Sequence, residues 1–290
     1  PRSTLFPYTT LFRSVCLTVA VLAACRLDAC TLWGAAGASA SGGTIISKNR
    51  DWKPDHTQEL KLERPAKGHA YFGLYAVGGT EPGIKAGVNE TGLTVVTASA
   101  SSIPKSKRDK QPGKRGVTAR LLSGCATCDE VLAKKDAIFP ESRAQFVMIS
   151  DRAKILVVEI GLEGKYAVKV LERGFAAHTN HFLEPALAAF NAAESAGSAV
   201  RLRRITQLLE TAGEPCSAEA FAAFSRDRHD GPDNSLWRTG NGKNTRTLAS
   251  WIVETPANGA PTLRVLLANP GQPEESRTFV LNPEFWRGQP

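Results

Sequence analysis

The sequence of 290 residues contains one methionine, Met148, and begins with Pro1, so we expect the natural start of the protein to be missing from it. It has no apolar run of the roughly 20 residues that a membrane-spanning helix needs. It also has no repeat period and no low-complexity tract, which argues against a repeat protein and favours a single domain. A hydrophobic content of 42% is ordinary for a globular protein with a full core.

Cysteine is also scarce. The sequence has six, of which four follow residue 29: Cys30, Cys125, Cys128 and Cys216. This number and spacing do not suit a disulfide scaffold. Cys125 and Cys128 have the spacing of a redox pair, but no strand leads into a thioredoxin-like helix there, so we favour a helix-packing or disulfide role.

We interpret the first 29 residues as two segments that precede the folded protein. We interpret residues 1–14 as the translation of a sequencing adapter. The apolar run 15–25 has the length of a signal-peptide core, so we predict a signal peptide over 15–29, cleavage after Ala29, and a periplasmic or secreted protein. An alternative interpretation of this segment remains, because residues 22–25 (LAAC) resemble a lipoprotein box. Processing there would leave Cys25 as a lipidated N-terminus.

The net charge and its distribution do not indicate a nucleic-acid-binding protein. The formal net charge is +8, and it falls to +6 without residues 1–29, with 33 basic against 27 acidic residues. Six basic residues are concentrated between Lys105 and Arg115, but the serine, proline and glycine among them predict an exposed loop. We therefore expect no nucleic-acid partner.

The order of apolar patterns predicts an α+β fold with antiparallel sheets. Alternating or short apolar runs bounded by turn residues predict strands at 44–46, 83–88, 93–98, 145–149, 155–160, 166–171, 248–254, 263–267 and 278–281. Helical spacing predicts helices at 118–134, 184–194, 199–211 and 217–224. The connections between most strands are short, which requires antiparallel pairing.

Cys30 is the first candidate catalytic residue. A thiol with a pKa of about 8.5 needs a base, and a free α-amino group with a pKa of about 7.7–8.0 on the same residue can provide it. An internal amide nitrogen cannot, so the chemistry requires Cys30 to become the first residue. The predicted cleavage after Ala29 would achieve this. The alternative is that Cys30 is a small buried residue at the start of a strand.

Four motifs in order give a resemblance to a known family. CTLWGAAG at Cys30, NRDW at Asn49, AGVNETGLTV at Ala86 and HTNHF at His178 resemble the N-terminal-nucleophile hydrolases. The similar branch is that of choloylglycine hydrolase and the penicillin acyltransferase-like enzymes. The resemblance implies one catalytic domain over 30–290 with a four-layer αββα sandwich, in which two antiparallel sheets lie between helix layers.

The resemblance also implies roles for individual residues. Cys30 matches the nucleophile, and Asp51 matches a carboxylate that holds the α-amino group of the nucleophile. Asn180 matches an amide that helps to stabilise the tetrahedral oxyanion, a role worth about 3–4 kcal/mol. A cation near the thiol favours the thiolate, and relatives often have an arginine where this chain has Lys48, with Arg50 nearby. Which of these two cations points inward is left open.

Other candidate site residues have weaker support from the resemblance. Arg201 resembles a family arginine near the nucleophile, although a solvated basic helix face is an equal interpretation. Ser99 stands where relatives often carry an asparagine, so a backbone N–H would have to replace that oxyanion donor. Trp52, Ser99, His181 and His229 are expected to line or shape the substrate pocket.

His178 and His181 are spaced like two metal ligands, but no third ligand accompanies them, so we expect no metal.

The leading hypothesis is an exported cysteine hydrolase of linear carbon–nitrogen amides. It uses a small-molecule substrate, an acyl-enzyme and no cofactor, and it is not inserted in a membrane after processing. An acyltransferase that uses an amine acceptor at the same site is an alternative. Two rivals are a lipidated, non-catalytic envelope binding protein and a thiol–disulfide protein. Relatives are often dimers or tetramers, so a homo-oligomer is a further expectation.

Overall fold

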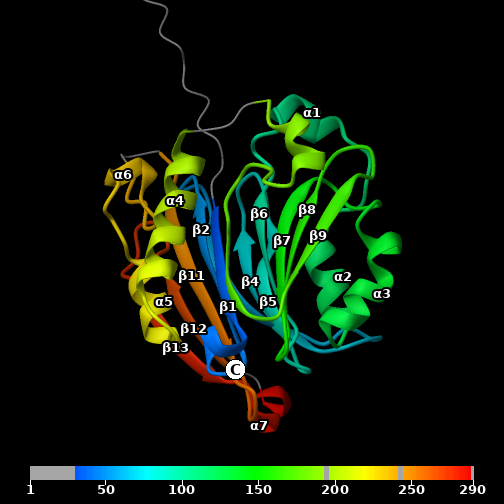
Figure 1. Ribbon diagram of the computed structural model, residues 1–290, viewed down its shortest axis with the longest axis vertical. Helices are drawn as coiled ribbons and strands as arrows, with labels where there is room; N and C mark the ends of the chain where they lie inside the picture. Colours follow the sequence, from blue (N-terminus) through cyan, green and yellow to red (C-terminus); the bar gives the residue numbers. More distant parts are fainter. Residues whose placement is uncertain (1–29, 193–195, 241–243, 289–290) are drawn as a thin grey trace, which may run out of the picture.

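The computed structural model describes residues 30–192, 196–240 and 244–288. The expected adapter translation 1–14, the expected leader 15–29 and its Cys25 lie outside these residues. Within them the chain forms two antiparallel sheets packed face to face, with helices on their outer sides (Figure 1). No helix in the described ranges is both long and apolar enough to cross a bilayer.

Sheet A has six strands in the order β10-β1-β2-β11-β12-β13, and all neighbours are antiparallel. The bounds are β1 (Cys30–Ala36), β2 (Thr44–Trp52), β10 (Gly174–His178), β11 (Arg246–Thr255), β12 (Thr262–Leu267) and β13 (Glu275–Val280). Every residue of β1 and β2 is buried, because sheet A is covered on both faces. The charged end of β2 therefore lies inside the protein, where charges are rare unless they are paired or functional.

Sheet B has seven strands in sequence order, β3-β4-β5-β6-β7-β8-β9, again antiparallel throughout. The bounds are β3 (Thr57–Glu63), β4 (Tyr71–Val77), β5 (Gly83–Asn89), β6 (Thr94–Ser99), β7 (Gln145–Ser150), β8 (Ile155–Ile160) and β9 (Tyr166–Leu171). The strands predicted at 83–88 and 93–98 pair with each other in this sheet, and so do the three strands predicted between residues 145 and 171.

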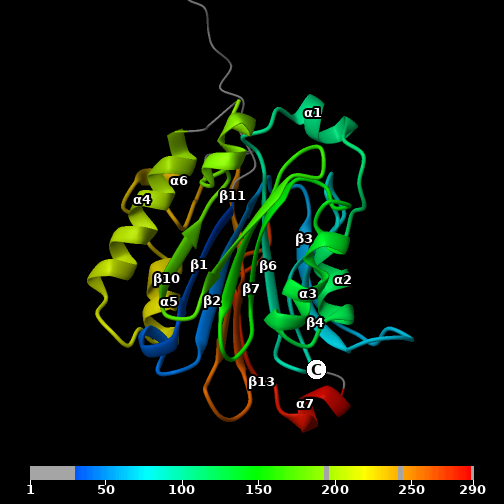
Figure 2. The ribbon, with the colours of Figure 1, turned by 45° about the vertical axis from the view of Figure 1, so that its right-hand side comes forward.

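Helices cover the outer face of each sheet. In both ribbon views α4 (Ala196–Thr211) and α5 (Ala218–Ser225) lie outside sheet A, and α2 (Val117–Gly124) and α3 (Cys128–Ile138) lie outside sheet B (Figure 2). The remaining short helices are η1 (Gly37–Ala40), α1 (Lys105–Lys110), η2 (Pro185–Phe190), α6 (Gly231–Asn234) and α7 (Pro283–Arg287). This order of layers confirms the predicted αββα sandwich.

Three apolar clusters fill the spaces between these layers. The side chains of β1 point alternately to the two faces of sheet A, so they contribute to two of these clusters. Cys30 and Leu32 point toward sheet B, where they join the cluster between the sheets with Trp251, Phe72 and Met148. The intervening residue Trp33 points the other way and packs with the helices of the sheet A side. A third cluster joins the outer face of sheet B to α2 and α3.

Gly34 allows the two sheets to approach closely. A Cβ atom at this position would lie 2.7 Å from Ile155 Cδ1 and 3.0 Å from the oxygen of Ile45. Any side chain would therefore push β1 away from sheet B. This close packing holds β1, and with it Cys30, against the second sheet.

The predicted helix over 118–134 is wrong, because the chain forms two helices with a break at Cys125. Asn89 Nδ2 donates to the main-chain oxygens of Leu122 and Cys125, which satisfies carbonyls at the end of α2. Thr127 then begins α3 as an N-cap that accepts from the N–H of Glu130. The Thr127-x-x-Glu130 spacing is a capping signature that indicates this start in the sequence.

Other predicted boundaries also differ from the structure. Residues 105–110 are helix α1 rather than loop, although none of them is buried. The predicted helix 184–194 is the short 3-10 helix η2, which Pro185 begins, and residues 193–194 lie outside the described ranges. Strands β1, β3, β4 and β10 were not located by the apolar pattern. In β3 and β4, polar residues and Gly73 weaken the alternating signal.

Candidate active site

The pairing of β1 with β2 brings Cys30 together with two cations. Cys30 lies opposite Arg50, and Leu32 lies opposite Lys48. Directly opposed residues share one face of an antiparallel pair, and so do residues two apart on a strand. Lys48, Arg50 and Cys30 therefore all face sheet B. Both cations point inward, which answers the question that the sequence left open.

The thiol of Cys30 is placed in an environment that favours the thiolate. Cys30 is 2% exposed, and its Sγ lies 3.9 Å from the main-chain oxygen of Asp51. Burial by itself raises the pKa of the Cys30 thiol, but the charges of Lys48 and Arg50 lower this pKa below its ordinary value. The negative charge of Asp51 partly opposes them. A lowered thiol pKa is what a cysteine nucleophile requires.

Lys48 and Arg50 are held by different contacts. Lys48 donates from Nζ to the main-chain oxygen of Thr97 on β6, so it bridges the two sheets. Burial, and then the neighbouring Arg50, lower the pKa of Lys48 to about 8. Arg50 donates to the main-chain oxygen of Asp51 at 3.0 Å, and its guanidinium lies 4.4 Å from the ring centre of Trp52. Arg50 is thus held in place by two contacts, and Lys48 can change its charge at mildly alkaline pH.

Asp51 points to the opposite face of β2, toward the helix layer. Its Oδ1 accepts a hydrogen bond of 2.7 Å from Thr247 Oγ1 on the neighbouring strand β11. Within the described ranges its buried Oδ2 has no hydrogen-bond partner. Burial raises the pKa of Asp51, while Arg238 and Arg201 oppose that rise. The carboxylate can therefore accept a further hydrogen bond from a nearby donor.

Asn180 follows β10 and contacts the main chain of the candidate nucleophile. Its Oδ1 accepts from the main-chain nitrogen of Cys30 at 2.9 Å and from Arg201 at 3.1 Å. Its Nδ2 donates to the main-chain oxygen of Ser99 at 2.9 Å. These contacts fix the orientation of the amide. An amide nitrogen carries two hydrogens, so one remains for an oxygen of a ligand.

Arg201 is the inward-facing arginine of α4. It is 1% exposed, and it donates at 2.8 Å both to the main-chain oxygen of Cys30 and to Thr31 Oγ1. Of the other two arginines in this stretch, Arg203 is exposed and Arg204 pairs with Asp227 at 2.6 Å. The alternative of a solvated basic face therefore applies to Arg203 and not to Arg201.

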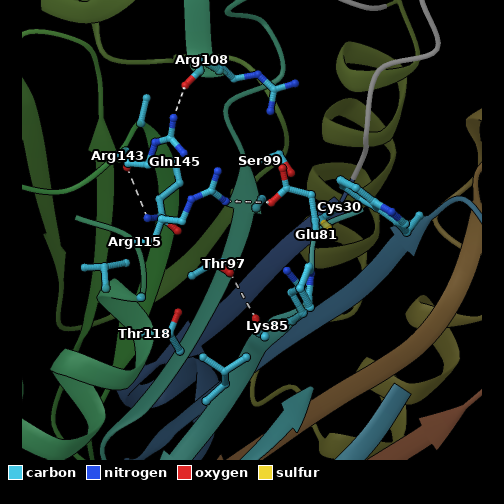
Figure 3. Close-up of a pocket in the computed structure, with 18 of the residues that line it drawn as sticks. Cys30, Glu81, Lys85, Thr97, Ser99, Arg108, Arg115, Thr118, Arg143 and Gln145 are labelled. Carbon is cyan, nitrogen blue, oxygen red and sulfur yellow. Dashed lines mark hydrogen bonds and ion pairs between the residues drawn. The ribbon is translucent and has the colours of Figure 1, made fainter. Parts of the chain in front are cut away.

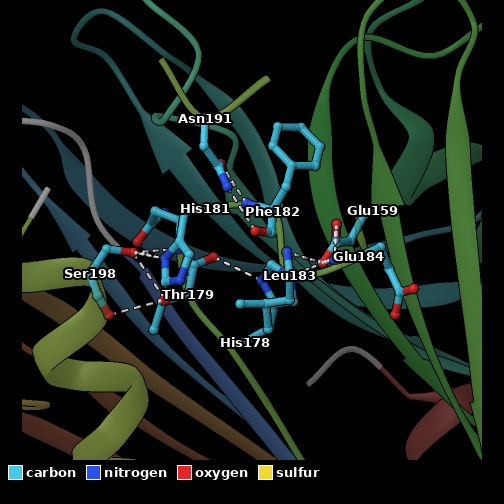
Figure 4. Close-up of polar contacts among 10 residues, drawn as sticks. Glu159, His178, Thr179, His181, Phe182, Leu183, Glu184, Asn191 and Ser198 are labelled. Atoms are coloured by element: carbon cyan, nitrogen blue, oxygen red, sulfur yellow. Dashed lines mark hydrogen bonds and ion pairs between the residues drawn. The ribbon is translucent and has the colours of Figure 1, made fainter. Parts of the chain in front are cut away.

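A buried polar network fixes the segment 178–181 that carries Asn180 (Figure 4). His178 Nε2 lies 2.9 Å from Glu159 Oε1 on β8, and Glu159 also accepts from the main-chain nitrogens of residues 183 and 184. Ser198 on α4 accepts from the nitrogen of Asn180 at 3.0 Å and lies 2.8 Å from His181 Nδ1. One end of this network is attached to sheet B and the other to a helix of sheet A.

A cavity of about 410 Å³ opens beside Cys30 between β2, β5, β6 and the segments around α1 (Figure 3). Trp52 and Ser99 line it, as expected, and so does Lys85 of β5. Ser99 also accepts from Asn180 through its main-chain oxygen. The cavity thus gives a small molecule access to the thiol.

Two residues expected at the pocket do not line it. His181 is buried against Ser198 behind the segment that carries Asn180. The side chain of His229 is 65% exposed and lies beside Asp230, with the ring nitrogen 3.3 Å from the carboxylate. His229 precedes α6 in the chain and is not among the residues that line the cavity. Across the described ranges, no group of three side chains suits a metal ion.

The cysteines in the described part of the chain are unpaired. Cys125 and Cys128 are buried in the cluster between sheet B and its helices, which agrees with a helix-packing role and not with a disulfide. Burial, and then the charge of Asp151, raise the pKa of Cys128. A raised thiol pKa is unfavourable for redox exchange.

Four residues of the site were not identified from the sequence: Thr97, Lys85, Glu159 and Thr247. Glu159 carried a usable signal, because a carboxylate within the otherwise apolar ILVVEI strand must find partners when it is buried. Thr97, Lys85 and Thr247 carried none. Thr247 meets Asp51 through the pairing of the distant strands β11 and β2, and Thr97 and Lys85 meet the site because sheet B faces sheet A there.

Comparison with known proteins supports this picture. The family model described as acyl-coenzyme A:6-aminopenicillanic acid acyl-transferase matches residues 39–272. No curated protein matches the chain by sequence. Among solved structures, a mutant of conjugated bile acid hydrolase from Clostridium perfringens is similar with 13% identity and a TM-score of 0.55, over 89% of this chain and 95% of that chain.

A second similar structure is the N-acylethanolamine-hydrolyzing acid amidase orthologue of Caenorhabditis elegans. It shares 12% identity with a TM-score of 0.50, over 79% of this chain and 93% of that chain. At these identities the likeness concerns the fold, and it agrees with the two antiparallel sheets between helix layers described above.

Proposed function

Because the chain belongs to the acyl-coenzyme A:6-aminopenicillanic acid acyl-transferase family, within the N-terminal-nucleophile hydrolases, we propose that it cleaves linear carbon–nitrogen amides with Cys30 as its nucleophile. One observation carries the proposal. Cys30 lines a cavity, and Lys48 and Arg50 share its face and lower the pKa of its thiol. Such a thiolate beside an accessible space suits attack on a carbonyl carbon.

The base in this proposal is the α-amino group that Cys30 acquires when residues 1–29 are removed. In the uncleaved chain the nitrogen of Cys30 is a peptide amide, which cannot accept a proton. The free amine can accept a proton, since its pKa is about 7.7–8.0, and its nitrogen carries more hydrogens for donation than a peptide nitrogen does. Asn180 Oδ1 already accepts from this nitrogen, and the unused Oδ2 of Asp51 is available as a further acceptor.

The reaction proceeds in two steps. The α-amino group takes the proton of the Cys30 thiol, and the sulfur attacks the amide carbon. The carbon–nitrogen bond then breaks as the leaving amine takes that proton from the α-ammonium group. Water then attacks the thioester, the carbon–sulfur bond breaks, and a carboxylic acid leaves as the thiol regains its proton. Asn180 Nδ2 supplies a hydrogen for the oxyanion in both tetrahedral intermediates.

Acyl transfer is the second candidate, and the family description favours it, since it names an acyltransferase. The same acyl-enzyme would then pass its acyl group to an amine in place of water. Product analysis with a constant substrate and an increasing concentration of an amine acceptor separates the two activities. A rise in the acylated amine at the expense of the free acid indicates transfer.

Removal of residues 1–29 during export is part of the proposal, and it places the mature protein in the periplasm or outside the cell. The length of the apolar run 15–25 and Ala29 at the cut support it. The mass of the mature N-terminus tests it. A chain that begins with Cys30 is expected, and a diacylated chain that begins with Cys25 would contradict both the cut and the α-amino base.

The proposed activity is tested by comparing three proteins on a panel of acyl amides. The first begins at Cys30, the second retains residues 1–29, and the third begins at residue 30 with Cys30→Ala. Only the first is expected to hydrolyse an amide, and all three are expected to have the same circular dichroism spectrum. Equal hydrolysis by the protein that retains residues 1–29 would refute the role of the α-amino group.

A further inference from the structure

The cavity beside Cys30 carries an excess of positive charge. Of its charged lining residues other than Cys30, two are acidic, Glu81 and Asp109. The basic ones outnumber them three to one: Lys48, Arg50, Lys85, Arg108, Arg115 and Arg143. Small-molecule sites usually place a few charged groups where a ligand carries the opposite charge.

Both acidic residues already have cationic partners. Glu81 lies 3.4 Å from Arg115, and Asp109 pairs with Lys105 across one turn of α1. Neither carboxylate is therefore directed at the cations near the thiol. In the described residues, Lys48, Arg50 and Lys85 have no carboxylate within the distance of an ion pair, which leaves three cations around one space.

Lys85 is the cation best placed to receive a ligand. It projects from β5 into the lower part of the cavity, below Cys30 (Figure 3). Its Nζ makes no hydrogen bond with the described residues, in contrast to Lys48, which donates to Thr97. Burial and then the charges of Arg50 and Lys48 lower the pKa of Lys85 to about 7, with Glu81 and Cys30 opposing. Glu81 and Cys30 offset only part of this effect, so Lys85 gains from the further negative charge of a ligand.

We propose that Lys85 binds an anionic group of the substrate, such as a carboxylate, and that the site prefers amides that carry one. This inference rests on the proposed function for the identity of the substrate as an amide. The preference of the cavity for anions rests on the arrangement of charges and can be measured without any amide hydrolysis.

The arrangement also predicts a dependence on pH. An anion beside Lys85 raises the pKa of that lysine, so the anion and a proton bind together. Binding of an anionic ligand therefore weakens as the pH rises through about 7, the pKa of Lys85 in the unliganded protein. Lys85 is one of six basic residues that line the cavity, so the loss is partial.

Alkylation of Cys30 tests the preference with two reagents of nearly equal size. Iodoacetate is an anion and iodoacetamide is neutral, and both transfer a carbon to the sulfur with release of iodide. The measurement is the rate of modification of the Cys30 peptide by mass spectrometry in the wild-type chain, in Lys85→Gln and in Lys169→Gln. Lys169 is exposed on β9 and does not line the cavity, so it gives a matched loss of charge.

We expect Lys85→Gln to lower the ratio of the iodoacetate rate to the iodoacetamide rate by about fivefold or more, and Lys169→Gln to leave it unchanged. The ratio cancels any change in the ionisation of Cys30, because both reagents react with the same thiolate. An unchanged ratio in Lys85→Gln, or no labelling of Cys30 by either reagent, would overturn the proposal.

Substrate kinetics then connect the anion site to the activity. For a matched pair of an acyl-glycine and the corresponding acyl-glycinamide, Lys85→Gln should raise KM for the anionic substrate about tenfold and change KM for the neutral one little. Equal effects on both substrates would overturn the preference. A failure to hydrolyse either substrate, together with a lowered alkylation ratio, would instead count against the proposed activity and support the anion site.

Discussion

The guanidinium of Arg201 donates a hydrogen bond of 2.8 Å to the main-chain oxygen of Cys30. A second nitrogen of the same group donates to Asn180 Oδ1 at 3.1 Å. One side chain on a helix outside sheet A therefore fixes the position of the candidate nucleophile relative to the candidate oxyanion donor. The planar fork of arginine makes this double contact possible, and a lysine has no such geometry.

Arg201→Lys tests this arrangement. The substitution keeps the charge near Asp51 but loses at least one of the two contacts, so kcat should fall by about tenfold or more. Arg203→Lys on the exposed side of the same helix is the control, and its kcat should equal that of the wild type. Steady-state kinetics with the protein that begins at Cys30 check both. Equal kcat values in the two variants would show that the double contact does not matter for catalysis.

Lys48→Met should make Cys30 harder to ionise. Lys48 is the first of the two cations that lower the pKa of the Cys30 thiol, so its removal raises that pKa. A rise of one pKa unit would slow alkylation by iodoacetamide at neutral pH about tenfold. The measurement is the rate of alkylation as a function of pH, with Lys169→Met as the control. An unchanged midpoint would mean that Arg50 alone sets the ionisation.

Asn180→Ala should reduce turnover rather than binding. Removal of one oxyanion donor typically lowers kcat by about 10²–10³-fold, because the donor acts mainly in the transition state. KM should change little. Asn282→Ala removes the N-cap of α7 and should cost stability without a loss of kcat. A rise in KM with an unchanged kcat for Asn180→Ala would assign this amide to ground-state binding.

Glu159→Gln should loosen the segment that carries Asn180. Glu159 is buried, pairs with His178 and accepts from two main-chain nitrogens, so we expect the free energy of unfolding to fall by about 2–4 kcal/mol and kcat to fall with it. The exposed Glu163→Gln in a nearby turn should change stability by less than about 0.5 kcal/mol. Urea denaturation of both variants checks the difference, and equal stabilities would contradict a supporting role.

The strands of sheet B were predicted best where short apolar runs are bounded by turn residues, as in β8 and β9, whose bounds agree with the prediction. Such a run is a local property of the chain, so the sequence carries it directly. The edge strand β3 has mostly polar residues, and only its pairing with β4 shows that it is a strand. The end of α2 was missed for a similar reason, because its carbonyls bind Asn89 from a distant turn, whereas the N-cap of α3 at Thr127 is a local signal.

The prediction of the candidate site had the same limit, because contacts between distant segments are not visible in a local pattern. Cys30, Asp51 and Asn180 stood out because short motifs carry them in a recognisable order. Lys85 was not identified, because a lysine in a strand next to a turn is usually solvated, and only the cavity shows what it faces. His229 was placed at the pocket because loops commonly contact ligands, and this general tendency does not determine which part of the sandwich a given loop covers.

The central claim is that Cys30, as the first residue, forms the acyl-enzyme. The most direct measurement is rapid quenching of the protein that begins at Cys30 during turnover of an acyl amide, followed by mass analysis of its N-terminal peptide. We expect a transient increase in mass equal to the acyl group on Cys30, absent from Cys30→Ala and from the protein that retains residues 1–29. An acyl group on another residue, or undiminished turnover without any acylated Cys30, would contradict the claim.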